Sequence, residues 1–147
     1  MNLIPLTDPV ERDALLAGDT GDRQAAPGWP HADTPAGFSF LDHGGRAFLV
    51  IDDEGRIAGE CGTKSPPTAA GVVEIGYGLA AGSRGKRLGS AAVAQLVALL
   101  SDLPDVRIIE AEVHESNPAS WRILLALGFA EYGGLDPKGF QRYRKSV

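Results

Sequence analysis

The 147-residue sequence holds a single cysteine, few basic residues and no long hydrophobic run. One cysteine, Cys61, excludes an internal disulfide and a metal site built from several thiolates. Lys and Arg number 14 against 19 Asp and Glu, whereas a general nucleic-acid-binding protein needs a basic face to neutralise phosphates. The longest apolar stretch, Ala91 to Leu100, is interrupted by Gln95 and has about half the length of a membrane span. The sequence therefore predicts no nucleic-acid partner and no membrane crossing.

The rest of the composition is that of an ordinary globular domain, with 44% hydrophobic and 22% charged residues. The length suits one domain, predicted to span residues 1–147. Met1–Leu6 is too short and uncharged for a signal peptide, which favours a cytoplasmic, reducing compartment. There Cys61 is expected to be a small apolar residue buried in a strand. His43 and His114 have no partners at a useful spacing, so no metal site is predicted.

Strand and helix signals alternate from residue 47 onward. Residues 18–46 are rich in Gly, Pro, Asp and Thr, which predicts long loops or short helices over a core. The expected strands are 47–51, 56–61, 72–80, 107–114 and 140–145, with a further short strand before the last, and the expected helices are 89–101 and 118–127. This order predicts an α+β, or mixed α/β, fold.

Two of these elements have clearly different faces. In the strand 72–80, the period of two places Val73, Ile75, Tyr77 and Leu79 on one side and Val72, Glu74, Gly76, Gly78 and Ala80 on the other. In the helix 89–101, the helical spacing predicts one buried stripe, made of Val93, Leu96, Val97 and Leu100.

The segment between that strand and that helix carries the strongest chemical signal. Arg84, Lys86 and Arg87 place three cations within four residues of an acidic protein. The free N–H groups and positive dipole end of a helix N-terminus already favour an anion, and Gly85 and Gly89 allow a close approach to the backbone. A pyrophosphate site is predicted. The loop is not a Walker A motif, because Ala80 and Arg87 stand where Gly and Ser or Thr are required.

The whole stretch resembles the GNAT acyltransferase family, in which a strand leads into an Arg/Gln-x-x-Gly-x-Gly/Ala loop. An Asn after the next strand and a helix ending in Gly-Phe complete the resemblance, here Asn117 and Gly128-Phe129. It covers roughly residues 47 to 132 and implies a mostly antiparallel twisted sheet flanked by helices, with acetyl-CoA as cosubstrate. The residues that it assigns to CoA binding are Leu79, Ala80, Arg84, Gly85, Lys86, Arg87, Leu88, Gly89, Ser90 and Asn117.

Two departures from the family pattern affect the expected chemistry. Arg87 replaces the middle Gly of the pyrophosphate loop, and Leu124 stands where many members have a Tyr that protonates the leaving thiolate. Glu74-Ile75-Gly76-Tyr77 and Asn117-x-x-Ser120 are similar to the Rim-type branch, which acetylates the α-amino group of ribosomal proteins and has relatives that modify small amines. That branch often has Ser near the thioester, so Ser120 is the implied proton donor or hydrogen-bond partner.

Transfer from a thioester to an amine also needs a base and an oxyanion donor. Glu74 is the predicted base, because it lies on the strand face where Gly76 and Gly78 leave room for a ligand. Glu110 and Glu112 are its rivals on the neighbouring strand. A backbone N–H near Leu79 is the oxyanion donor that the family resemblance implies.

The acceptor is expected to be an amine, on a small molecule or a protein N-terminus. The family resemblance implies that its groove is built by residues 18–46 and 133–139, and the candidate lining residues are His31, Trp29, Tyr132 and Tyr143. The chain is thus predicted to be an acetyl-CoA-dependent N-acetyltransferase acting without a covalent enzyme intermediate. The alternatives are a non-catalytic acyl-CoA-binding module and a protein-interaction domain. A homodimer is compatible with each.

Overall fold

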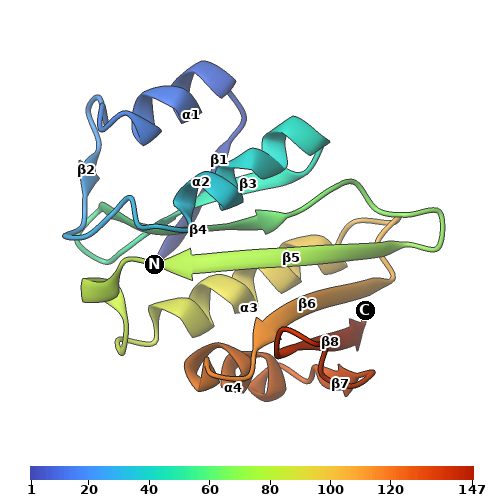
Figure 1. Cartoon of the computed structure of the whole chain (residues 1–147). Coiled ribbons are helices and arrows are strands. Elements are labelled where there is room, and N and C mark those ends of the chain that lie inside the picture. Colours follow the sequence, from blue (N-terminus) through green and yellow to red (C-terminus); the bar gives the residue numbers. More distant parts are fainter.

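The computed structural model describes residues 1–147 and contains one eight-stranded sheet flanked by helices (Figure 1). The strands are β1 (Asn2–Leu6), β2 (Gln24–Ala25), β3 (Arg46–Ile51), β4 (Arg56–Thr63), β5 (Val72–Leu79), β6 (Ile108–His114), β7 (Ala130–Tyr132) and β8 (Phe140–Ser146). Their order is β1-β3-β4-β5-β6-β8-β7, with β2 beside β4. Only β2–β4 and β5–β6 are parallel pairs, so the predicted α+β fold with a mostly antiparallel sheet is confirmed.

Helices cover both faces of this sheet. They are α1 (Pro9–Leu16), α2 (Thr34–Phe38), α3 (Leu88–Ser101) and α4 (Pro118–Ala126), with single 3-10 turns η1 (Ser39–His43) and η2 (Ala81–Ser83). Helices α3 and α4 pack on one face, which we call the α3 face, and α1 and α2 on the other, which we call the α2 face. None of the helices has the length and apolar character needed to cross a lipid bilayer.

Alternating side chains divide the core between the two faces, as the period of a strand requires. In β3, Phe48 and Val50 join the core of the α3 face, whereas Leu49 and Ile51 join that of the α2 face. The predicted stripe of α3, made of Val93, Leu96, Val97 and Leu100, is buried throughout. Cys61 of β4 is buried as predicted, and this burial raises the pKa of its thiol to about 12.

The N-terminal part contains elements that the sequence patterns did not predict. Strand β1 pairs only with β3, at the edge of the sheet, where Pro5 is tolerated because one side needs no donor. Helix α1 begins after Asp8, whose side chain accepts a hydrogen bond from the N–H of Val10, with Pro9 in the first turn. Within 18–46, the short α2, η1 and β2 agree with the expectation of short helices and loops.

Strands β5 and β6 separate toward their carboxyl ends (Figure 1). Their pairing ends at Ile75 and Ala111, although β5 continues to Leu79 and β6 to His114. The N–H of Ala80 donates to β4, at the O of Ala58. The backbone N–H and C=O groups of successive residues in a strand point alternately toward its two neighbours. Those of Ala80 point toward β4, so those of Tyr77 and Leu79 point toward the gap beside β6. The sheet therefore opens at its centre.

Candidate active site

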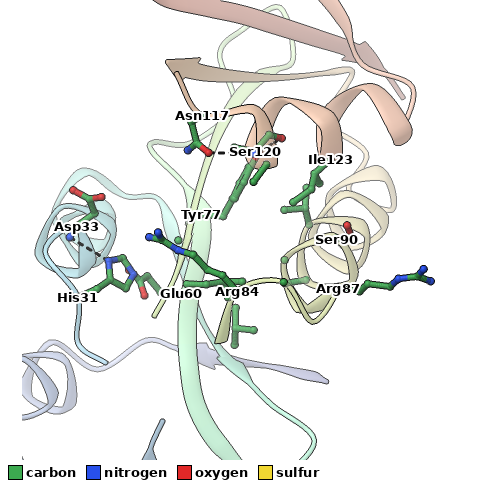
Figure 2. Close-up of a pocket in the computed structure, with 18 of the residues that line it drawn as sticks. His31, Asp33, Glu60, Tyr77, Arg84, Arg87, Ser90, Asn117, Ser120 and Ile123 are labelled. Atoms are coloured by element: carbon green, nitrogen blue, oxygen red, sulfur yellow. Dashed lines mark hydrogen bonds and ion pairs between the residues drawn. The ribbon is translucent and has the colours of Figure 1, made fainter. Parts of the chain in front are cut away.

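A cavity of about 550 Å³ lies at this opening (Figure 2). It is lined by residues of β4, β5, the loop before α3, the first turns of α3 and α4, and the segment before α2. The lining includes His31, Asp33, Glu60, Tyr77, Gly78, Leu79, Arg84, Gly85, Arg87, Gly89, Ser90, Ser116, Asn117, Ser120 and Ile123. Glu60 and His31 lie on the α2 face, and Tyr77 and Ser120 on the α3 face. The cavity is thus reached by groups from both faces of the sheet.

Most of the residues predicted to bind CoA line this cavity, and a few do not. Those in its wall are Leu79, Arg84, Gly85, Arg87, Gly89, Ser90 and Asn117. Ala80 and Leu88 are buried in the two cores, and Lys86 is exposed outside the wall. Of the predicted catalytic pair, Ser120 lines the cavity and Glu74 does not.

The two arginines of the loop point in different directions. Figure 2 shows the Arg84 side chain extending over the cavity toward His31, while the Arg87 side chain points away. The charge of Arg84 helps to lower the pKa of His31, after burial, which is the larger cause. Arg84 is therefore the cation of the loop that faces the cavity.

Arg87 has a backbone conformation that explains why the family pattern has Gly at this position. Its φ of 61° is the only positive φ of a non-glycine residue in the structure. A side chain in this left-handed region costs roughly 1–2 kcal/mol. The turn before α3 thus requires the conformation that Gly adopts freely.

We expect Arg87→Gly to be more stable than Arg87→Ala by about 1 kcal/mol, since both remove the charge and only Gly relieves the strain. For a domain of this size, the melting temperature should differ by roughly 2–4 °C. Thermal melts of both variants beside the wild type measure this difference. Equal melting temperatures for the two variants would show that the turn relaxes around Ala.

Glu60 is the buried carboxylate of the cavity. Its side chain is 5% exposed, and its Oε2 accepts a hydrogen bond of 3.0 Å from the Trp29 indole N–H. Burial raises the pKa of Glu60 to about 7, despite the hydrogen bonds from Trp29 and Thr34 that lower it. A carboxyl group with this pKa can both accept and release a proton near neutral pH.

His31 belongs to the segment before α2 and lies beside Glu60. Its Nε2 is 2.8 Å from Oε1 of Glu60, but the two atoms are not aligned as a hydrogen bond. Its Nδ1 accepts the N–H of Asp33 at 3.2 Å, which assigns the proton of the neutral ring to Nε2. Its ring covers Gly78, where an added Cβ would be 2.8 Å from His31 Cε1.

Glu74 lies outside the cavity. Its carboxylate pairs with Lys64, and its Oε1 is 3.6 Å from the Arg142 guanidinium. The space expected beside Gly76 is occupied, because the ring of Phe40 covers that glycine. The rival carboxylates are also paired, Glu110 with Arg144 and Glu112 with Arg142. The placement of these three side chains does not favour a role as base.

On the α3 face, two hydroxyl groups meet. The Ser120 hydroxyl donates to the Tyr77 hydroxyl at 2.8 Å, and the Tyr77 hydroxyl donates to the Ser120 carbonyl at 3.3 Å. Burial raises the pKa of Tyr77 to about 12. Asn117 caps α4 by accepting the N–H of Ser120. Leu124 is fully buried in the core.

Of the proposed acceptor residues, only His31 lines the cavity. Trp29 is buried behind Glu60, Tyr143 is buried in the core, and Tyr132 packs under the Arg144 guanidinium. Sequence reasoning missed Glu60 and the role of Tyr77 in the site. One signal was available: Glu60 is the only charged residue between Arg56 and Lys64, within an otherwise apolar and Gly-rich strand.

The residues of the cavity fit acetyl-CoA. The first N–H groups of α3 have no helical partners and adjoin Arg84, which suits a pyrophosphate. The backbone groups of Tyr77 and Leu79 are free of β6 and face the gap, as expected for an extended arm that pairs with a strand edge. Gly89 is closely packed, since an added Cβ would be 3.3 Å from the side chains of Leu79 and Ile123.

Several solved structures share this fold. A spermidine N-acetyltransferase, a chimera of Vibrio cholerae SpeG and hSSAT, has 16% identity over 99% of this chain and 96% of its own, with a TM-score of 0.73. The aminoglycoside acetyltransferase AAC(6')-Ib in complex with coenzyme A has 20% identity, 99% and 95% coverage, and a TM-score of 0.68. The GNAT domain of S. lividans PAT has 15% identity, 99% and 89% coverage, and a TM-score of 0.69.

No curated protein sequence matches the chain significantly. The family model of the acetyltransferase (GNAT) domain, however, matches residues 8–130, which include the loop before α3, Glu60 and the whole wall of the cavity. The sequence match and the shared fold agree. The chain therefore belongs to the GNAT family of acetyl-CoA-dependent N-acetyltransferases.

Proposed function

We propose that this protein transfers an acetyl group from acetyl-CoA to a primary amine by direct attack, with Glu60 as the general base. The observation that carries this proposal is the position of Glu60, a buried carboxyl with a pKa of about 7 in the wall of the cavity. It lies on the face of the sheet opposite Tyr77 and Ser120, so base and leaving group would be separated by the reacting carbon.

An amine must lose a proton before or during its attack. An α-amine has a reference pKa of roughly 7.7–8.0 and a lysine-type amine one near 10.4, so most acceptor molecules carry the proton at neutral pH. Glu60 can accept that proton, directly or through a water, and Trp29 holds its carboxylate by donating to Oε2. His31 Nε2, at 2.8 Å from Oε1, already carries the ring proton, so the proton taken up by Glu60 would leave through water.

As the amine attacks, negative charge develops on the thioester oxygen and needs a hydrogen-bond donor at the edge of β5. Bound acetyl-CoA would supply the thioester carbonyl. The N–H of Leu79, which faces the gap without a partner on β6, is the proposed oxyanion donor. Ser120 and Tyr77 supply hydroxyl groups on the side where the thiol product leaves.

The acceptor side of the cavity favours a cationic amine. Asp33 and Glu60 both line it, and the chain has a net charge of -5, which would steer a cation toward it. The neighbours named for spermidine and aminoglycoside acetylation and the Rim-type resemblance together define the acceptors to be tested. These are a polyamine, an aminoglycoside and a peptide with a free N-terminus.

Saturating acetyl-CoA should raise the melting temperature by about 5–11 °C, since a ligand at 100 times its Kd stabilises by ~2.7 kcal/mol. Arg84→Ala should lose most of this rise, because Arg84 is the cation of the loop that extends over the cavity. Lys86→Ala is the matched control: it removes the same charge two residues away, outside the cavity wall, and should keep the rise.

A rise followed by release of free thiol with one of the three amines would support the transferase. A rise with no thiol released from any amine would favour the acyl-CoA-binding alternative. If the folded wild-type protein shows no rise at all, the acetyl-CoA proposal is wrong.

A further inference from the structure

In the hydroxyl pair formed by Tyr77 of β5 and Ser120 of α4, the two hydroxyl groups have different roles as donor and acceptor. Ser120 donates its only hydroxyl proton to the Tyr77 oxygen, at 2.8 Å. The Tyr77 proton is held by a long contact of 3.3 Å to the Ser120 carbonyl, which as a helix carbonyl also accepts from the amide four residues later. In this pair, only the Tyr77 proton is free to turn to another acceptor at little cost.

The position of Tyr77 places that proton on the leaving-group side. Tyr77 and its strand partner Cys61 point to the α3 face, whereas the neighbouring pair, Gly78 and Glu60, is on the α2 face with His31. The amine and its base approach from the α2 face. The sulfur that departs therefore faces the hydroxyl pair, which lines the same cavity.

Position 124 cannot supply this hydroxyl group. Leu124 is one turn beyond Ser120 on α4 and is fully buried in the core of the α3 face. A donor for the sulfur must come from another residue, and Tyr77 of β5 and Ser120 of α4 both carry a hydroxyl group into the cavity wall.

We propose that Tyr77, and not Ser120, donates the hydrogen bond that stabilises the departing CoA sulfur, and that Ser120 is a positioning residue that acts through Tyr77. This inference rests on the proposed transferase function. The C–S bond breaks and its electron pair stays on sulfur, so the thiolate accepts the Tyr77 hydrogen bond. By donating to the Tyr77 oxygen, Ser120 fixes the phenol and strengthens it as a donor.

The phenol donates without giving up its proton. With a pKa of about 12 for Tyr77 and about 8.5 for a thiol, proton transfer to the thiolate would be unfavourable on the order of a thousandfold. The bound product should therefore be a thiolate stabilised by a hydrogen bond, and its proton should come from solvent as it leaves.

The test measures the pKa of the CoA thiol when CoA is bound, by titrating the ultraviolet absorbance of its thiolate, with desulfo-CoA as the blank. Cys61 does not interfere, because its own pKa is about 12. In the wild type, a hydrogen bond to the charged sulfur should lower the thiol pKa by about one unit or more relative to free CoA. Tyr77→Phe should abolish this shift.

Three further variants separate Tyr77 from Ser120. Ser120→Ala should keep part of the shift, and the double variant should equal Tyr77→Phe alone, because Ser120 acts only through Tyr77. Ser116→Ala is the matched control, since its hydroxyl lies in the cavity wall but contacts His114 at 2.7 Å; it should keep the shift. Thermal melts with CoA verify folding and binding. In turnover, Tyr77→Phe should lower kcat by about 10–100-fold with little change in the KM for acetyl-CoA.

A shift abolished by Ser120→Ala and kept in Tyr77→Phe would overturn the inference in favour of Ser120. Bound CoA with the same thiol pKa as free CoA would overturn it as well, while leaving the transferase proposal intact. Failure of CoA to bind the folded wild type would overturn both.

Discussion

Glu60→Gln should lower kcat/KM by about 10²–10⁴-fold, the usual contribution of a general base. Gln keeps the size of the side chain and an oxygen that can accept the Trp29 N–H, which at present bonds to Oε2, but it cannot accept a proton from the amine. The pH profile should change as well. The wild-type rate should rise with pH through about 7, where Glu60 ionises, and the variant should lack this limb.

The matched control is Glu74→Gln, on the adjacent strand. Its carboxylate pairs with Lys64 and Arg142 outside the cavity, so its removal should change kcat/KM only a few-fold. Both variants are to be assayed by free-thiol release with the most active amine. A large loss in Glu74→Gln together with a small one in Glu60→Gln would restore Glu74 as the base and overturn the assignment to Glu60.

Glu60→Gln should also change how the stability of the protein depends on pH. Its effect on the free energy of unfolding should be about 3 kcal/mol more stabilising above neutral pH than below pH 4.5. The pKa of Glu60 is about 7 in the folded protein, against an ordinary value of 4.5 for a solvated glutamate. Because the folded-state pKa is the higher one, the stability that the protonated carboxyl provides is complete below pH 4.5. It is lost as the pH rises through about 7. Gln has no charge to bury and escapes this loss.

Urea unfolding of wild type and variant at pH 4.5 and pH 8 isolates this contribution, because every other titrating group is common to both proteins. The difference in unfolding free energy between the two should grow with pH across that window. A difference independent of pH would mean that Glu60 ionises in the folded state as easily as in the unfolded state, and its burial would then not explain its chemistry.

The sequence predicted best what depends on near neighbours along the chain. The loop from Arg84 to Gly89 and the cap at Asn117 are contiguous motifs, and the structure places their helices as expected. The faces of β5 follow from a period of two, so Tyr77 and Leu79 were correctly placed on the same side as Val73 and Ile75. Strand β1 and helix α1 were missed because Pro5 weakens the strand pattern and α1 buries only Leu15.

What depends on contacts between distant elements could not be predicted. Glu60 becomes a buried acid only because Trp29 and His31, about thirty residues earlier, cover it. Glu74 had the more suggestive position in sequence, yet Lys64 and Arg142 lie beside it once β4 and β8 are in place. The glycines of β5 did mark a close approach, but Phe40 and His31 of this chain fill that space in place of a ligand.

Different segments of the chain line the opening between β5 and β6, and these segments can change independently in evolution. The reacting centre is framed by strand backbone, while residues 18–46 reach it from the α2 face and the loop before α3 from the other. If the proposed assignment holds, substitutions and insertions in residues 18–46 can remodel the pocket for a different amine without touching the loop before α3. A family built on such a sheet can diversify its acceptors while it inherits one donor, and its members can keep the fold after most of their sequence identity is gone.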